Sequence, residues 1–269
     1  MIATATLLRA TCVLLGLWGL LHAAQWLVDL PNWRAGSALG WDLQGLRKGI
    51  KGRSALFAAL VGERGLRLLA ALLALVGLLL VVLPLGPLSP PLLAGALALA
   101  VLLGQRTIPD GADKMAMVVA SGALLQALGF ALENAALVLA GALWTGGQLT
   151  IAYFAAGASK VILADWRSGA APRAALDSYM WGNRLSAWGV NLPGGAIALA
   201  WTVMVFEMLF PLALLLPTGG LIAVLTCFFL FHAAIALVMG LNTYPLAFLA
   251  AYPSAIWLGQ WLRGAIGLG

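Results

Sequence analysis

Long apolar runs, separated by short segments rich in proline, glycine or charged residues, make up most of this sequence. Such runs are typical of transmembrane helices, which need about 20 mostly apolar residues to cross a bilayer. The runs lack the alternation of apolar and polar residues that is typical of membrane barrel strands. About eight transmembrane helices are therefore predicted, near residues 7–29, 66–86, 88–105, 115–141, 148–164, 196–217, 219–241 and 244–262.

Proline and glycine mark the predicted connections, because they interrupt helices or supply unusual backbone angles. The segment 83–91 joins the second and third spans, Trp144–Gly147 the fourth and fifth, and Pro217–Gly220 the sixth and seventh. The first apolar run, which follows Arg9, also has the outline of a signal peptide. Its extension through Trp26 favours a retained span.

Composition supports a membrane protein. Of 269 residues, 63% are hydrophobic and 9% are charged, and the mean hydropathy is +1.01. A water-soluble domain needs more charge to cover its surface. We therefore expect an all-α, polytopic integral membrane helical bundle that forms one transmembrane domain over residues 1–269.

The net charge of +6 comes from basic residues that flank the apolar runs. If the spans alternate in direction, the loops after the first, third and fifth spans carry most of this charge on one side. The positive-inside rule places that side in the cytoplasm, in a bacterial-type inner or plasma membrane. Lipids are then the expected partners, rather than nucleic acid. The basic loop 31–65 is either an interfacial helix or an ordinary loop that sets the topology.

Lys160 is the most informative candidate, because an ammonium group inside an apolar segment is costly unless it is paired, neutralised or functional. A desolvated lysine is also a potential base at neutral pH. At about 1.5 Å per residue, His22, Glu207 and His232 fall in the same half of the membrane as Lys160. The sequence therefore predicts a pocket that opens toward the basic side and holds these four side chains.

Each of these residues also has a purely structural interpretation. Lys160 is shallow enough to reach the interface without a partner. The histidines are suited to hydrogen bonds between helices, and Glu207 to the backbone disrupted by Pro211. The tryptophans of loop 165–195 are typical of interfacial anchors. No pattern of metal ligands appears, and no metal is expected. Cys12 and Cys227 lie in predicted spans, where a disulfide framework is not expected.

Two segments resemble a known family. The first runs from Tyr153-Phe154 through Gly157 and Lys160 to Asp165-Trp166 and Gly169; the second runs from Glu207 and Pro211 through Phe231-His232 to Met239-Gly240-Leu241. Their order and spacing resemble the membrane domain of vitamin K-dependent γ-carboxylases and the wider HTTM group, which includes sporulation-delaying protein B-type proteins. Gly111–Asp113 is similar to the polar loop of this family, and the resemblance covers about residues 105–257.

This resemblance implies a membrane enzyme that modifies a peptide. Lys160 would be the base that deprotonates a reduced, vitamin K-like quinone, His232 would contact a quinone oxygen, and Tyr153 and Trp166 would help to bind cofactor or substrate. Glu207 and His22 would support them. The chain has no large soluble portion like that of the carboxylases, so a small peptide substrate and a separate soluble subunit are expected. The alternative is a non-catalytic membrane protein, such as a lipid-binding scaffold, an immunity component or a transport component.

Overall fold

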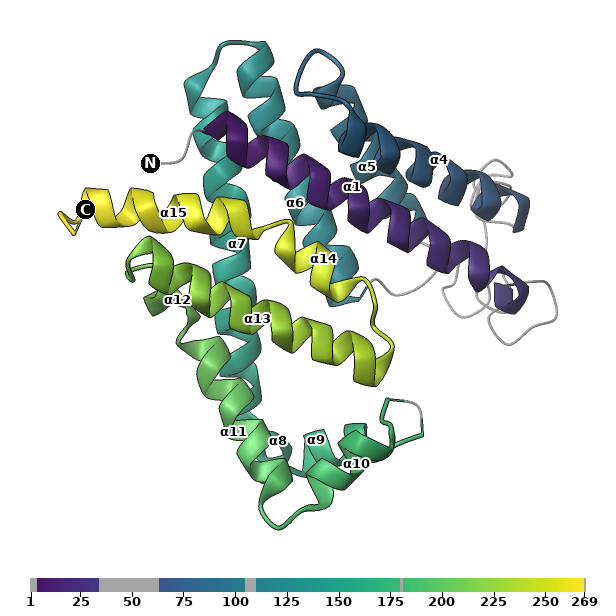
Figure 1. The fold of residues 1–269 in the computed structure, drawn as a ribbon, viewed down its shortest axis with the longest axis vertical. Helices are drawn as coiled ribbons and strands as arrows, with labels where there is room; N and C mark the ends of the chain where they lie inside the picture. The colour runs from purple at the N-terminus through teal and green to yellow at the C-terminus, as the bar shows by residue number, and fades with distance from the viewer. Residues whose placement is uncertain (1–3, 34–62, 105–109, 180, 269) are drawn as a thin grey trace. The chain divides into compact units, whose positions relative to one another are not determined.

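The computed structural model describes residues 4–33, 63–104, 110–179 and 181–268. Within these ranges the chain is helical and contains no strand (Figure 1). Among the described residues, five helices are long and apolar enough to cross a membrane, or six if one bent pair counts as a single span. The expected all-α membrane bundle is confirmed. The surface helix considered for loop 31–65, around Arg47, Lys48 and Lys51, lies outside the described residues.

The described chain divides into two compact units. The unit formed by residues 3–142 contains α1 (Thr4–Val28), α4 (Glu63–Val82), α5 (Ser89–Gly104), α6 (Gly111–Ala131) and the start of α7 (Ala135–Ile162). A short 3-10 helix, Leu30–Trp33, follows α1. Within this unit α1 lies against α4 (Figure 1). The Arg9 guanidinium donates to the carbonyl oxygens of Leu80 and Val81 at 2.7 and 2.5 Å, and so satisfies acceptors at the end of α4.

The second unit contains the rest of α7, from residue 143, and all the helices that follow. These are α8 (Ala164–Arg167), α9 (Ala170–Leu176), α10 (Arg184–Asn191), α11 (Gly195–Met208), α12 (Phe210–Ala213), α13 (Thr218–Met239), α14 (Tyr244–Leu249) and α15 (Tyr252–Ala265). The tryptophan-rich segment 165–195 thus forms three short helices rather than a loop. The pair α10 and α11 is bent by 97°.

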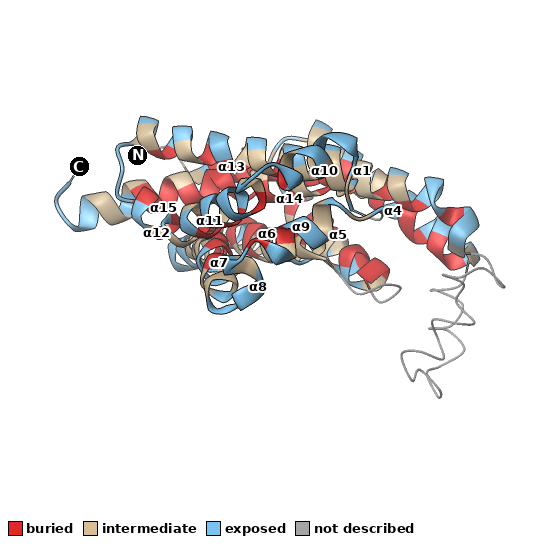
Figure 2. Cartoon of the chain, turned by 90° about the horizontal axis from the view of Figure 1, so that it is seen from below, coloured by how far each residue is buried: buried red, intermediate tan, exposed pale blue. Residues whose placement is uncertain are grey.

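The helices bury one side and expose apolar residues on the other (Figure 2). On α1 the buried residues recur at intervals of three or four, as Leu8, Cys12, Leu15 and Trp18 show. On α13, Leu230 and Leu237 are 60% and 84% exposed. Large exposed apolar side chains on long helices are typical of surfaces that face lipid.

The predicted connection at Trp144–Gly147 is wrong. These residues lie inside α7, and the turn between α6 and α7 is at residues 132–134. Glu133 has a φ of 51°, and the Asn134 side chain accepts from the backbone N–H groups of Ala136 and Leu137 at 3.0 and 3.2 Å. An asparagine in this position satisfies free donors at a helix start, so the polar pair Glu133-Asn134 was the signal for the turn.

The glycines at 146 and 147 have different surroundings inside α7. A Cβ atom at Gly146 would lie 2.8 Å from the Ser254 carbonyl oxygen of α15, whereas one at Gly147 would meet nothing within 4 Å. Gly146 therefore permits close packing of two helices, which is a common use of small residues in membranes. From the sequence alone, both glycines are predicted to lie in a turn.

We expect Gly147→Ala to raise the free energy of unfolding by about 0.5–1 kcal/mol, because alanine is favoured over glycine in a helix interior. Gly146→Ala should lower it by about 1–3 kcal/mol, because α15 must shift. Thermal unfolding of each variant in the same detergent measures the difference. Equal effects of the two substitutions would contradict a continuous α7.

Candidate functional site

The close approach of α7 and α11 places the first pair of site residues. A Cβ atom at Gly157 would lie 2.7 and 2.8 Å from the Met208 nitrogen and the Met204 oxygen, so only glycine permits this crossing without a shift. Lys160 follows Gly157 by three residues, in the last turn of α7. Glu207 lies on α11 beside the same crossing. The backbone contact thus brings the two ionisable side chains together.

Lys160 and Glu207 form an ion pair. The Lys160 Nζ atom lies 2.5 Å from Glu207 Oε2, and the two side chains are 20% and 7% exposed. Lys160 Nζ also lies 5.2 Å from the centre of the Trp166 ring, within the range of a cation–π contact. A lysine that simply reached the interface would need no such partners. The structure therefore favours a paired lysine over one that only extends toward water.

Arg167 holds the segment that carries Trp166. Its guanidinium donates to the carbonyl oxygens of Val161 and Ile162 at 2.7 and 2.6 Å. These carbonyls belong to the end of α7, where acceptors lack partners within the helix. The short helix α8 is thereby tied to α7, and the indole stays next to the Lys160 ammonium.

A second polar group joins three helices. The Tyr153 hydroxyl of α7 lies 3.0 Å from His232 Nε2 of α13 and 3.4 Å from the Tyr252 hydroxyl at the start of α15. All three side chains are buried. Buried tyrosine hydroxyls usually have a hydrogen-bond partner, and here they supply partners for each other and for the imidazole.

Aromatic rings enclose this polar group. The His232 ring stacks on Phe248 with 4.1 Å between ring centres, and the Tyr153 ring lies 4.1 Å from that of Phe228 and 4.7 Å from that of Phe210. The polar atoms therefore lie in apolar surroundings, where hydrogen bonds are strong and an unpaired polar atom is costly.

The two groups share helix α7. Tyr153 and Lys160 are seven residues apart on it, which is about two helical turns, so they lie on the same side of the helix. We therefore treat Tyr153, Lys160, Trp166, Glu207, His232 and Tyr252 as one set, called the Lys160–His232 site. Opposite charges, a neutral imidazole and two phenols are combined in this set, so it contains groups able to accept and to donate protons.

One atom of this site has no partner. His232 Nδ1 is buried and forms no hydrogen bond with any described residue, and the whole His232 residue is 4% exposed. Most buried polar atoms in proteins are hydrogen-bonded, so an unpaired one calls for an explanation. Nδ1 is therefore the atom of this site that is left to bond an added polar group.

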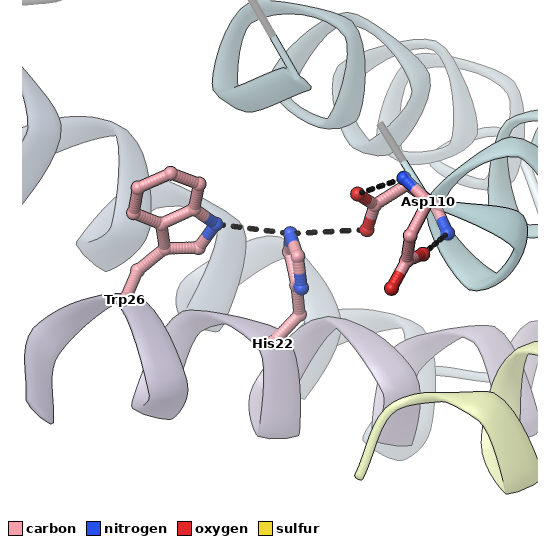
Figure 3. Close-up of polar contacts among 4 residues, drawn as sticks. His22, Trp26 and Asp110 are labelled. Atoms are coloured by element: carbon pink, nitrogen blue, oxygen red, sulfur yellow. Dashed lines mark hydrogen bonds and ion pairs between the residues drawn. The ribbon is translucent and has the colours of Figure 1, made fainter. Parts of the chain in front are cut away.

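His22 belongs to the other unit and is described with it. Its Nε2 atom lies 3.0 Å from Trp26 Nε1 and 3.6 Å from Asp113 Oδ1 (Figure 3), and its ring stacks on Trp18 with 4.8 Å between ring centres. Asp113 also forms a reciprocal cap with Asp110 at the start of α6. The segment Gly111–Asp113 therefore begins a helix, and the shared pocket with His22 stays a prediction.

The sequence missed Tyr252. The sequence identified five candidates that lie in this unit, and the structure joins them in two groups: Lys160 with Glu207 and Trp166, and Tyr153 with His232. Tyr252 lies in an apolar C-terminal segment and has no charge to draw attention to it. The available signal was that a tyrosine inside a membrane helix has to find a partner for its hydroxyl.

No group of three or more histidine, cysteine, aspartate or glutamate side chains in the described part of the chain lies suitably for a metal ion. Comparisons with protein-family models, curated proteins and solved structures find no match for this chain.

The Lys160–Glu207 pair should show strong energetic coupling. We expect Lys160→Met and Glu207→Gln each to lower the free energy of unfolding by about 1–3 kcal/mol, and the double variant to lose less than the sum by about 1 kcal/mol or more. Thermal or denaturant unfolding in one detergent provides all four values.

The exposed pair Arg67–Glu63 is the matched control, because its separation is 2.7 Å but its side chains are 53% and 36% exposed. Its coupling, measured with Arg67→Met and Glu63→Gln, should stay below about 0.5 kcal/mol. Coupling of Lys160 to Glu207 no larger than that of the control would contradict a buried ion pair.

Proposed function

We propose that this chain is a membrane enzyme in which Lys160 acts as a base toward a reduced, quinone-like cofactor, so that a peptide is modified. The proposal combines the resemblance to the vitamin K-dependent γ-carboxylase and HTTM group with the geometry of the Lys160–His232 site. The observation that supports it is the presence, in one unit, of a paired, largely buried amine and of a buried imidazole whose Nδ1 has no partner. The expected membrane location is consistent with the apolar helices.

Glu207 makes the chemistry of Lys160 plausible. A lysine ammonium cannot accept a proton, so the amine has to become neutral before it acts as a base. In apolar surroundings, separated charges are costly compared with neutral partners. When the shared proton moves to the Glu207 carboxyl, the Lys160 amine is free to accept a proton from a bound hydroxyl. The pair can therefore store and release a proton without leaving a lone buried charge.

The remaining residues would bind and orient. The buried Nδ1 of His232 fits an oxygen of a quinone-like ring, and the rings of Tyr153, Phe248 and Trp166 supply apolar surface. A bound cofactor of this kind would, once deprotonated, supply a base strong enough to act on the peptide. A small peptide and a soluble partner subunit remain part of this proposal. The basic side of the membrane, inferred to be cytoplasmic, would be the side from which they arrive.

A non-catalytic membrane protein is the second candidate. The ion pair favours it, because the Glu207 carboxylate alone accounts for a lysine in an apolar helix. Lys160 and Glu207 would then hold α7 against α11 in a lipid-binding scaffold, an immunity component or a transport component. The two candidates differ in what happens when the lysine keeps its charge but loses the ability to act as a base.

One assay distinguishes the enzyme from the non-catalytic protein. It follows, by absorbance, the oxidation of 2-methyl-1,4-naphthoquinol by oxygen in vesicles that contain the protein. If Lys160 is a base, the wild type should oxidise the quinol faster than protein-free vesicles do. Lys160→Met should lower this protein-dependent rate on the order of 100-fold. Lys160→Arg should fail as well, because a guanidinium does not deprotonate.

The control is Lys114→Met, which removes an exposed lysine from α6 and should leave the rate unchanged. A wild-type rate equal to that of empty vesicles, or full activity in Lys160→Arg, would favour the non-catalytic candidate.

A further inference from the structure

The buried hydroxyl of Tyr252 determines how the protons are arranged in the Lys160–His232 site. Tyr252 is 5% exposed, and among the described residues its hydroxyl contacts the Tyr153 hydroxyl at 3.4 Å. A buried O–H group needs an acceptor, because an unpaired one loses its hydrogen bonds to water without replacement. The Tyr252 O–H therefore donates to the Tyr153 oxygen.

The direction of the next hydrogen bond follows from the first. The Tyr153 oxygen accepts from Tyr252, so its own O–H is directed to its other partner, His232 Nε2, at 3.0 Å. Chemical preference agrees with this direction. A phenol is the better donor and an imidazole nitrogen the better acceptor, as their ordinary pKa values of about 10 and 6.5 indicate. His232 Nε2 is then an acceptor and carries no proton.

A neutral imidazole carries one proton, so this proton has to lie on Nδ1. Nδ1 is the buried atom that has no partner among the described residues. The His232 ring stacks on Phe248, and apolar surroundings disfavour a charged ring. The Glu207 carboxylate is already bound to Lys160 at 2.5 Å.

We propose that Tyr252 and Tyr153 are positioning residues that fix the proton of His232 on Nδ1, which makes this N–H a buried donor for the acceptor oxygen of an apolar ligand. The inference deepens the proposed function and, for the ligand class alone, rests on it. The buried N–H also determines which ligands the site selects. The site accepts a carbonyl or phenolate oxygen at this point and discriminates against a ring of the same shape that lacks one, because the N–H would stay unpaired.

The proton position is directly observable by nitrogen NMR. The chain has two histidines, His22 and His232, so protein labelled with ¹⁵N-histidine gives two sets of ring signals, and His22→Gln identifies those of His232. We expect the wild type to carry the His232 proton on Nδ1. Tyr153→Phe removes the donor to Nε2, and Tyr252→Phe removes the group that orients it, so both variants should shift the ring toward the form protonated on Nε2.

Tyr179→Phe is the matched control, because Tyr179 is fully exposed, and it should leave the signals unchanged. Circular dichroism and thermal unfolding of each variant show whether it has kept its fold. A wild-type His232 protonated on Nε2 overturns the inference. So does an unchanged proton position in folded Tyr153→Phe and Tyr252→Phe.

The ligand class is tested with two probes of equal shape. Adding 2-methyl-1,4-naphthoquinone should move the Nδ1 signal of His232, and 2-methylnaphthalene, which lacks oxygen, should leave it in place. Equal shifts with both probes would overturn the donor role. If the quinone fails to bind at all, the proposed function loses its cofactor, whereas the proton position measured without ligand still decides the inference.

Discussion

The cost of a charge in apolar surroundings is the constraint on which the second unit depends. An ammonium at the end of α7 is stable there because a carboxylate lies 2.5 Å away, and the removal of either partner would leave an uncompensated charge. That pairing requires α11 to approach α7 closely. Gly157 permits the approach, since any Cβ at this position would collide with the backbone of α11. Sequence, helix packing and site chemistry are therefore linked through one glycine and one ion pair.

Much of this could be predicted from the sequence, because burial in a bilayer leaves strong signals. Long apolar runs identify the helices, and the proline-rich segment 83–91 marks a real turn between α4 and α5. Ionisable groups are so unfavourable in such runs that Lys160, Glu207 and His232 stood out individually. The residues that pair with them could not be predicted from the sequence in the same way. Glu207 follows Lys160 by 47 residues, and pairing at that distance depends on helix packing, which composition does not encode.

The errors have a common physical cause. Glycine serves both as a turn residue and as a contact point between membrane helices, and the second use explains why Trp144–Gly147 continues a helix. Tyrosine is also ambiguous, since its ring suits an apolar core while its hydroxyl requires a partner. Tyr252 was overlooked for this reason. In both cases the deciding information is a contact with a distant segment: α15 for Gly146, and α7 for Tyr252.

The two polar groups of the site, Lys160 with Glu207 and His232 with the two tyrosines, differ in whether their hydrogen bonds are complete. Lys160 and Glu207 satisfy each other, and a purely structural role accounts for them. His232 differs, because its Nε2 is paired and its Nδ1 is not. An apolar residue at position 232 would avoid the cost of an unpaired buried nitrogen, which is about 1–3 kcal/mol. His22 shows the same pattern, because its Nε2 lies near Trp26 and its Nδ1 is unpaired. His232 differs from His22 in that its paired nitrogen contacts a hydroxyl from another helix, which in turn contacts a second hydroxyl. The proposed ligand contact at Nδ1 depends on this connection between α13, α7 and α15.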